Sequence, residues 1–523
     1  MDAEYLIGLD YGTESARGVL IDVATGAVCA SHARNYRHGT LTRTLPNGTA
    51  LPADWALQNA ADYLECAETI LSTLGRDKRV MGIGIGFTAS SPLPVSSDGT
   101  ALSERFPHQP HAYVKLWKHH SAQPWADKIN QAGGNFLDKF GGKTSGEWLP
   151  AKAAQLAAES PELWVQTARF IEAGDWLVWQ LTGQEVRSSD MARYKAHYSA
   201  ECGYPDFGIV DLEGRLSAPA LIGSTAGAMC AAWRERTGIR GQASVAVASI
   251  DSHVILPALG AVDARTLVGA LGTSAVFMLL DDEERPLPAG IEGVAKDAAL
   301  PDLWCYEAGQ AGFGDVLAWF VKATPLAEDT TENFAAYNAA AASLRAGESG
   351  LLALDWWSGC RVPYSDLQLN GLLVGLRVTT TPVDIYRALL ESLCFGARHI
   401  VEHLRAGGVA IDRTIVASGL SKNNPLLVQI MADVLNTKIA VPDLPHATAV
   451  GAAIHGSVAA GVVRNFQEGS ARFGARNFRW FEPEQPSAGV YDVLYAEYRA
   501  LAEQTRLRKT MHVLAGLALR AQG

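Results

Sequence analysis

The chain has 523 residues, of which 48% are hydrophobic and 19% charged, and its formal net charge is −11 at pH 7. This length favours two large domains, and the acidic balance implies no basic face, which argues against a nucleic-acid-binding or membrane-surface protein. The seven cysteines form no C-x-x-C pair, and neither a signal peptide nor an unbroken membrane-spanning stretch is evident, so we expect a cytoplasmic protein with free thiols.

The first elements form a strand–turn–strand pattern. Residues 4–36 alternate with a period near two and contain turns at Gly12-Thr13 and Thr25-Gly26. This predicts three strands with no helix between them. The next elements are a helix, a buried strand and a run of helices, predicted over residues 54–74, 79–89 and 149–183. The first half of the chain is therefore expected to be a mixed α/β domain.

The opening pattern returns in the second half of the chain. Residues 264–282 are again an apolar strand, a Gly-Thr turn at Gly272-Thr273 and an apolar strand. We interpret the repetition as an internal duplication that gives two related α/β domains, with a boundary near residues 252–262. The later elements are a helix, a strand and one long closing helix, predicted over residues 381–408, 413–419 and 490–516. The small residues of Thr448–Gly456 favour a closely packed helix.

Each Gly-Thr turn could bind phosphate. Glycine lets the backbone approach a ligand closely, and successive backbone N–H groups in such a turn make a concave anion site. Asp10 lies beside the first turn, where a carboxylate near phosphates is unfavourable unless a cation lies between them, so Asp10 predicts Mg²⁺. The alternative is two ordinary hairpins with glycine at a tight turn. The repetition and the charge favour a polyphosphate held between two hairpins that face each other across a cleft.

Asp251 is the candidate general base. An apolar strand delivers it to a loop near the predicted domain boundary, and phosphoryl transfer needs a base for the attacking hydroxyl. Its neighbour His253 is the weaker candidate. The alternative is that Asp251 only caps the next helix.

Together these motifs resemble the FGGY carbohydrate kinases of the actin-like ATPase superfamily. "DYGTESARG" and "ALGTSAV" carry this resemblance, while "GIGFTASSPLPV", "GGKTSGEWLPAK" and "YEAGQAGFGDVLAWFV" are similar to the L-ribulokinases within the family. The resemblance runs from residue 5 to about residue 465. It implies an α/β fold of two actin-like (ribonuclease H-like) ATPase domains with an interdomain cleft. Residues 1–255 would bind the sugar, and residues 256–523, with the closing C-terminal helix, would bind ATP.

The resemblance implies a kinase of arabinose catabolism that uses ATP and Mg²⁺ to phosphorylate L-ribulose at O5, giving L-ribulose 5-phosphate and ADP. Its partners would be the sugar and ATP, without nucleic acid or membrane, and the family suggests a homodimer. Asp251 would be the general base and Asp10 the metal residue. The implied sugar-binding residues are Ala89, Trp117, Lys118, Lys195, Asp251 and Glu307. The implied nucleotide-binding residues are Gly12, Thr13, Gly272, Thr273, Ser418, Gly419 and Asn424.

Three positions depart from the family pattern. Gly86 stands where related kinases often carry an aspartate, and Arg193 is bulky in a segment that usually has small residues before its lysine. Both leave open another pentulose or pentitol as substrate: D-ribulose, D-xylulose, ribitol or L-arabinitol. Ser418 replaces a glycine and bears on nucleotide affinity.

An alternative of a different class is an actin-like nucleotide-dependent binding protein without a small substrate. The polar set Lys195, Glu307 and Asp251 argues against it. A non-catalytic sugar sensor is disfavoured because Asp10 and Asp251 are both present.

Overall fold

The computed structural model describes residues 3–288 and 290–522. The chain forms two compact units. The first unit takes its residues from Met1–Val262, Val294–Cys305 and Leu444–Arg476, and the second from Asp263–Gly293, Tyr306–Asp443 and Asn477–Gly523. The sequence predicts two uninterrupted domains, whereas each unit is built from three segments.

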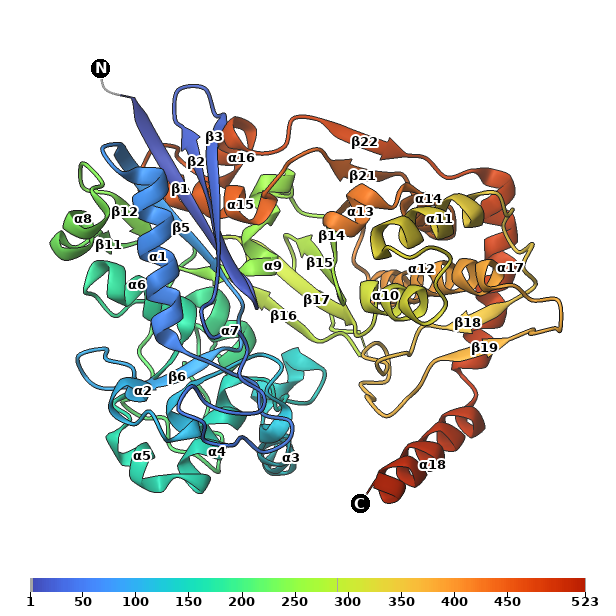
Figure 1. The fold of residues 1–523 in the computed structure, drawn as a ribbon, viewed down its shortest axis with the longest axis horizontal. Helices are drawn as coiled ribbons and strands as arrows, with labels where there is room; N and C mark the ends of the chain where they lie inside the picture. The colour runs from blue at the N-terminus through green and yellow to red at the C-terminus, as the bar shows by residue number, and fades with distance from the viewer. Residues whose placement is uncertain (1–2, 289, 523) are drawn as a thin grey trace. The chain divides into compact units, whose positions relative to one another are not determined.

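The first unit is organised around a large mixed sheet (Figure 1). β1 pairs antiparallel with β2, β2 pairs antiparallel with β3, and β5 runs parallel to β1. β12 and β13 also run parallel to β5. The strands of this sheet are β1 (Glu4–Tyr11), β2 (Ser15–Asp22), β3 (Val28–Asn35), β5 (Arg79–Phe87), β11 (Thr225–Ala228), β12 (Ser244–Ala246) and β13 (Ser249–Ile250). The three predicted opening strands and the predicted buried strand are confirmed.

Helices α1 (Ala60–Gly75) and α15 (Ala447–Ala459) cover opposite faces of this sheet, because consecutive residues of a strand point to opposite sides. A Cβ at Gly8 of β1 would lie 1.8 Å from the backbone oxygen of Ala449 in α15. A Cβ at Gly18, which pairs with the next residue of β1, would instead meet Ile70 of α1. The close packing expected for Thr448–Gly456 is therefore observed. It also explains why a segment late in the chain completes the first unit.

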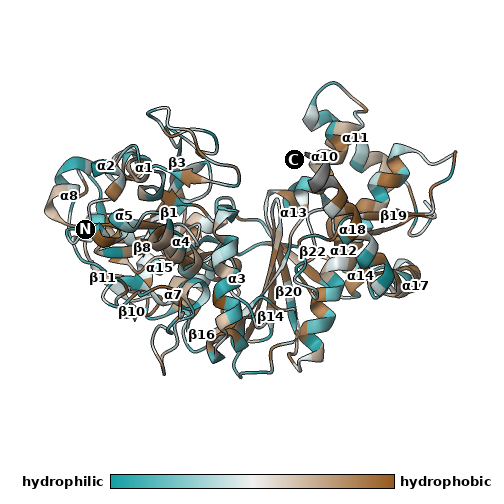
Figure 2. Ribbon diagram, turned by 90° about the horizontal axis from the view of Figure 1, so that it is seen from below, coloured by the Kyte–Doolittle hydropathy of each residue, from teal (hydrophilic) through white to brown (hydrophobic). Residues whose placement is uncertain are grey.

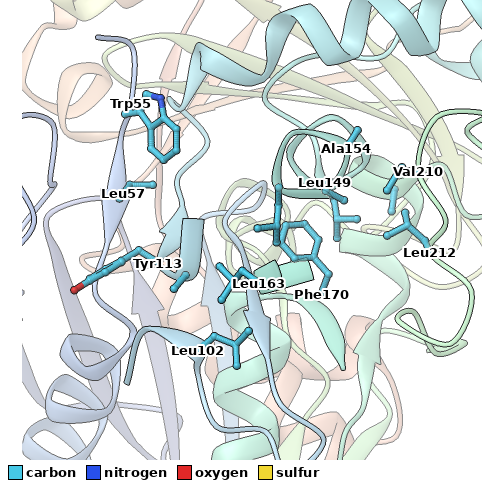
Figure 3. Packing of buried hydrophobic residues seen from close by; sticks show 14 of the residues in the cluster. Trp55, Leu57, Leu102, Tyr113, Leu149, Ala154, Leu163, Phe170, Val210 and Leu212 are labelled. Atoms are coloured by element: carbon cyan, nitrogen blue, oxygen red, sulfur yellow. The ribbon is translucent and has the colours of Figure 1, made fainter. Parts of the chain in front are cut away.

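The rest of the first unit is mainly helical, with short two-stranded pairs. Its core contains Trp55, Leu57, Tyr113, Leu149 and Phe170, which Figure 3 shows among the buried residues of one hydrophobic cluster. The helices are α2 (Leu102–Arg105), α3 (Gln123–Ala132), α4 (Leu149–Glu159), α5 (Pro161–Gln166), α6 (Ala173–Thr182), α7 (Ser189–Ala196), α8 (Ala231–Thr237), α9 (Asp251–Val254) and α16 (Phe466–Phe473). The pairs are β4 (Leu57–Gln58) with β7 (Val114–Lys115), β6 (Pro92–Val95) with β8 (Arg169–Glu172), and β9 (Arg187–Ser188) with β10 (Pro219–Ala220).

The second unit repeats the core of the first. β14 (Thr266–Leu271) pairs antiparallel with β15 (Ala275–Asp281) and parallel with β20 (Arg413–Ala417), as β1 does with β2 and β5. Figure 2 shows hydrophobic residues along β14 and β20, as expected for buried strands. The predicted duplication is confirmed at the level of topology. The sheet continues with β17 (Trp304–Gln310) beside β15, and with β21 (Ile439–Pro442) and β22 (Phe478–Phe481) beyond β20. The remaining strands are β16 (Gly293–Lys296), β18 (Leu352–Leu354) and β19 (Leu372–Val374).

Helix α12 (Pro382–Ala406) of the second unit begins where the sequence predicts. Thr381 and Asp384 form a reciprocal capping box and Pro382 occupies the first turn, which is a strong local start signal. The other helices are α10 (Gly314–Ala323), α11 (Thr330–Ala342), α13 (Gly419–Asn423), α14 (Pro425–Leu435), α17 (Gln485–Ala502) and α18 (Thr505–Gln522). None of the helices in the described residues is both long and apolar enough to cross a membrane.

The C-terminal region contains two helices, α17 and α18, where the sequence predicts one. The break follows Ala502, whose carbonyl accepts hydrogen bonds from the Tyr364 hydroxyl at 3.1 Å and from Arg508 Nη1 at 2.6 Å. These side chains satisfy a carbonyl that a continuous helix would pair with its own backbone. The helix predicted over 54–74 starts only at Ala60, because Asn59 caps it and the preceding residues form β4.

Candidate active site

The first Gly-Thr turn joins β1 to β2, and hydrogen bonds hold its backbone. The Tyr36 hydroxyl donates to the carbonyl of Gly12 at 2.8 Å. The Gln58 side-chain amide donates to the carbonyl of Thr13 at 2.5 Å. Trp117 Nε1 donates to the Thr13 hydroxyl at 3.1 Å, so this turn contacts a predicted sugar-binding residue directly.

The second Gly-Thr turn joins β14 to β15, and its carbonyls are held by the start of α10. The backbone N–H of Gly314 donates to Gly272, and that of Phe313 donates to Thr273. A Cβ at Gly314 would lie 2.7 Å from the Gly272 oxygen, so only glycine fits there. The sequence analysis did not single out Gly314, although it follows directly in "GQAGFGD".

Strand register brings Asp10 and Asp251 close together. Asp10 pairs with Gly86 of β5, and Gly86 pairs with Ser249 of β13, two residues before Asp251. Burial, and then the negative charge of Asp251, raise the pKa of Asp10 to about 7, while Arg17 at 3.6 Å lowers it. Two neighbouring carboxylates in a largely buried place repel each other, so a cation between them would be stabilising.

These residues fit a Mg²⁺ ion held partly by substrate. Among the residues that the structure describes, no group of three or more His, Cys, Asp or Glu side chains could hold a metal. Mg²⁺ commonly binds one or two carboxylates together with waters and substrate phosphates. The Asp10 carboxylate, with a second carboxylate nearby, matches that pattern.

Asp251 begins the short helix α9, and a buried residue holds the turn before it. Asp190 accepts hydrogen bonds from the Ser249 hydroxyl at 2.8 Å and from the Ile250 N–H at 2.9 Å. Its other oxygen lies 2.7 Å from Nδ1 of His253, and both side chains are fully buried. His253 therefore belongs to a buried pair, which explains why it is the weaker candidate base. No local pattern in the sequence indicates Asp190.

Asp190 also connects this turn to α7, the helix that carries Lys195 in its last turn. Lys195 is half-buried, and its Nζ lies 5.7 Å from the ring centroid of Tyr194 and 5.8 Å from that of Trp148. The structure thus joins two predicted sugar-site residues, Lys195 and Asp251, through one buried carboxylate.

The loops of Ala89 and Trp117 are tied together by Lys152, which is completely buried. Its Nζ donates to the carbonyls of Ser90 at 2.6 Å and Leu116 at 2.6 Å. These two residues directly follow Ala89 and directly precede Trp117. Lys152 was not among the predicted site residues.

The remaining predicted sugar-binding residues lie in different surroundings. Lys118 is an ion-pair partner of Glu14, with Nζ and Oε1 3.6 Å apart. Glu307 lies on β17 in the second unit, half-buried, and its carbonyl accepts from the Glu292 N–H at 3.0 Å. Sugar hydroxyls are uncharged and are bound by hydrogen bonds, so Lys118 and Glu307 do not need to form an ion pair with the substrate.

Three predicted nucleotide residues of the second unit lie at the two ends of α13: Ser418 and Gly419 at its start and Asn424 directly after it. Ser418 caps α13 by accepting from the Ser421 N–H, and its φ of 170° is extended backbone that any residue adopts. A serine in place of the family glycine therefore causes no backbone strain. A Cβ at Gly419 would meet no atom within 4 Å. Asn424 is buried and caps α14 by accepting from the Leu427 N–H at 3.1 Å, so it has a structural role of its own.

The other two departures from the family pattern are Gly86 and Arg193. A Cβ at Gly86 would lie 2.6 Å from Cγ1 of Val254, so the close approach of α9 to β5 leaves no space for an aspartate. Arg193 is half-buried on α7, with its guanidinium carbon 5.8 Å from the Tyr198 ring centroid.

Comparisons with known proteins show the family of the chain. Residues 267–460 match the C-terminal domain of the FGGY family of carbohydrate kinases. The chain is 39% identical over 521 residues to a ribulokinase of Bacillus licheniformis, covering 93% of this chain and 94% of that protein. It is 40% identical over 528 residues to a ribulokinase of Mycolicibacterium smegmatis, covering 95% and 93%.

Solved structures share the fold. A xylulose kinase from Rhodospirillum rubrum superposes with a TM-score of 0.82 at 22% identity, covering 97% of this chain and 100% of that one. A glycerol kinase from Plasmodium falciparum, solved with ADP, gives a TM-score of 0.79 at 16% identity, covering 95% and 98%. The predicted fold of two actin-like domains is confirmed. This protein belongs to the FGGY family of carbohydrate kinases.

Proposed function

We propose that this kinase phosphorylates L-ribulose at O5 with ATP, giving L-ribulose 5-phosphate and ADP. The observation that carries the proposal is the 38–40% identity to ribulokinases over nearly the whole chain. The closeness of Asp10 and Asp251 supports the chemistry, because it combines a base with a cation-binding carboxylate.

In the proposed reaction, the Asp251 carboxylate accepts the proton of the O5 hydroxyl. O5 then bonds to the γ-phosphorus, and the bond from that phosphorus to the β–γ bridging oxygen breaks to release ADP. Asp10 would hold Mg²⁺, which when bound would supply positive charge to neutralise the phosphate oxygens. The phosphates would be bound by Gly12, Thr13, Gly272 and Thr273, and the rest of the nucleotide by Ser418, Gly419 and Asn424. The sugar would be bound by Ala89, Trp117, Lys118, Lys195 and Glu307.

The proposal assigns sugar binding to the first unit, with Glu307 as a contribution from the second, and most nucleotide contacts to the second unit. Seven free thiols fit the expected cytoplasmic location. The homodimer suggested by the family stays a prediction, which light scattering in solution would decide.

Replacing the base tests the mechanism. Asp251→Asn should lower kcat by about 10²- to 10⁴-fold, the usual contribution of a general base. Calorimetry should give a Kd for Mg·ATP within about twofold of the wild type, since the residue does not bind the nucleotide in this proposal. Asp211→Asn, an exposed carboxylate in the same unit, is the matched control and should change neither value. Near-normal turnover by Asp251→Asn would exclude Asp251 as the base.

A sugar panel tests the substrate. The half-buried Arg193 on the Lys195 helix is the observation that favours a second candidate, a kinase for another pentulose or pentitol. A coupled assay should rank kcat/KM for L-ribulose above that for D-ribulose, D-xylulose, ribitol and L-arabinitol. A higher rank for any of these would replace the proposed substrate. ATP hydrolysis that is independent of every sugar would instead indicate an actin-like binding protein.

A further inference from the structure

Both carbonyl groups of the first Gly-Thr turn are held from one direction by buried side chains. Tyr36, directly after β3, donates to Gly12, and Gln58, at the end of β4, donates to Thr13. Tyr36 is 6% exposed and Gln58 only 1%. A carbonyl oxygen can only accept, so the Gln58 nitrogen must face Thr13. The Tyr63 hydroxyl fixes this orientation by donating to the Gln58 oxygen.

These contacts determine where the N–H groups of the turn point. In a trans peptide, the C=O of one residue and the N–H of the next lie in the same plane and point in opposite directions. The carbonyls of Gly12 and Thr13 face Tyr36 and Gln58, so the N–H groups of Thr13 and Glu14 face away from them. Neither N–H donates a hydrogen bond to any part of the chain that the structure describes. Both are therefore available for an anion.

The side chain of Glu14 does not occupy this position. Its Oε1 accepts from the Thr40 hydroxyl at 2.9 Å and lies 3.6 Å from Lys118 Nζ. The negative charge is thus paired with other groups.

The second turn has the same arrangement with different partners. Its carbonyls, on Gly272 and Thr273, accept from backbone N–H groups of Gly314 and Phe313. The N–H groups of Thr273 and Ser274 likewise donate to no described residue. Two turns that hold both carbonyls and leave the next two N–H groups available share a design suited to phosphate.

We propose that Tyr36 and Gln58 are positioning residues that aim the N–H groups of Thr13 and Glu14 at the phosphate chain of ATP. This rests on the proposed function, since it takes ATP as the ligand of the turn. Neither side chain touches the nucleotide. Each side chain holds the carbonyl of one peptide group, and the N–H at the opposite edge of that group makes the contact. Burial among other tyrosines raises the pKa of Tyr36 well above its ordinary value, so its hydroxyl stays a donor at working pH.

Two conservative substitutions test the proposal: Tyr36→Phe and Gln58→Met, which keep size and remove the donor. Each should raise the KM for ATP and the Kd for magnesium tripolyphosphate by about fivefold, the factor that matches one ordinary hydrogen bond. The KM for the sugar and the Kd for adenosine, which lacks phosphates, should stay within about twofold of the wild type. A change confined to the constants for ATP and tripolyphosphate indicates a specific effect on the phosphate site, whereas a general loss of structure would also change the constants for sugar and adenosine.

Matched controls come from the same unit. Tyr113→Phe removes a buried hydroxyl that donates to the Pro107 carbonyl at 2.9 Å, and Gln155→Met removes an equally buried amide. Both should leave all four constants unchanged. The proposal is overturned if tripolyphosphate binding of Tyr36→Phe and Gln58→Met matches the wild type, or if adenosine binding weakens as much.

Tripolyphosphate binding requires no sugar, so this test stands even if the wild type prefers another sugar. Thermal unfolding of each variant accompanies the binding experiment. If one variant does not fold, the other and its control still decide the outcome, because each donor acts on a different peptide group.

Discussion

Replacing Lys152 by methionine tests whether the sugar loops are held by a buried ammonium group. Its Nζ donates to three backbone carbonyls, those of Ser90, Leu116 and Lys115, at 2.6, 2.6 and 3.3 Å. Three acceptors require three N–H donors, which only the charged form of lysine supplies. Burial lowers the pKa of Lys152 to about 7, although the negative charge of Glu172 partly opposes this shift. Lys152→Met keeps the apolar stem and removes every donor.

The magnitude follows from the groups left unpaired. Three lost hydrogen bonds, each with a net value of about 1 kcal/mol, and the lost electrostatic attraction of the buried Glu172 carboxyl give a loss of about 3–5 kcal/mol. A unit of about 300 residues has an unfolding entropy of roughly 0.6 kcal/mol/K, so Tm should fall by about 5–8 °C. Adding Glu172→Gln should recover part of this loss, because it removes the stranded charge at Glu172.

The kinetic effect should be selective for the sugar. Lys152 holds the residues next to Ala89 and Trp117, so the KM for the sugar should rise by about tenfold, the cost of about 1.4 kcal/mol in positioning. The KM for ATP should change by less than about twofold, because Tyr36 and Gln58, rather than Lys152, hold the carbonyls of the Gly12-Thr13 turn.

Differential scanning calorimetry and a coupled kinase assay measure both effects. Lys128→Met is the control, since it removes one exposed positive charge from the same unit. The reasoning is refuted if Lys152→Met and Lys128→Met shift Tm equally. It is also refuted if the KM values for sugar and ATP rise together.

Two further predictions concern buried groups. Asp190→Asn should lower kcat by about tenfold or more and leave both KM values within about twofold, because Asp190 holds the turn before Asp251 and is not a predicted substrate contact. The control is Asp355→Asn, which changes a buried carboxylate of the second unit and should leave kcat unchanged. Equal losses of kcat in both variants would exclude a positioning role for Asp190. Burial lowers the pKa of His455 to about 3, so between about pH 6.5 and 3 the unfolded chain binds a proton that the folded state does not, and stability is lost as pH falls. Between pH 6.5 and 5, the free energy of unfolding of His455→Leu should therefore rise by about 2 kcal/mol relative to that of the wild type. The Tm difference between the two proteins should widen as the pH falls, and a Tm difference independent of pH would contradict this.

Local signals in the sequence were sufficient for many elements. The period-two strands with Gly-Thr turns predicted both hairpins, and helical spacing predicted α12, whose start the structure fixes with a capping box of Thr381 and Asp384. β8 was missed because its four residues, Arg169–Glu172, lie within a run of helical spacing and form a strand only by pairing with β6. The break after Ala502 was missed because one residue that binds the Ala502 carbonyl there, Tyr364, lies 138 residues away in the sequence.

The residues of the candidate site also fall into those with a local signal in the sequence and those without one. Asp10 and Asp251 could be predicted because each is a charge that ends an apolar strand, and strand register then brings them together. Asp190 and Lys152 could not be predicted. Asp190 contacts Ser249 at a separation of 59 residues, and Lys152 contacts Ser90 at 62. A buried lysine or aspartate looks like a surface residue in a sequence until the fold shows what it holds.

The two Gly-Thr turns show how a duplicated element can keep its geometry while its sequence diverges. In the second turn, backbone N–H groups hold the carbonyls, so a side-chain substitution does not remove these donors, and Gly314 is fixed by space. In the first turn, side chains do this work, and a single substitution of Tyr36 or Gln58 can remove a donor without moving the backbone. The first turn is therefore where natural variation can tune phosphate affinity in small steps. In the second turn, the corresponding change requires moving the start of α10.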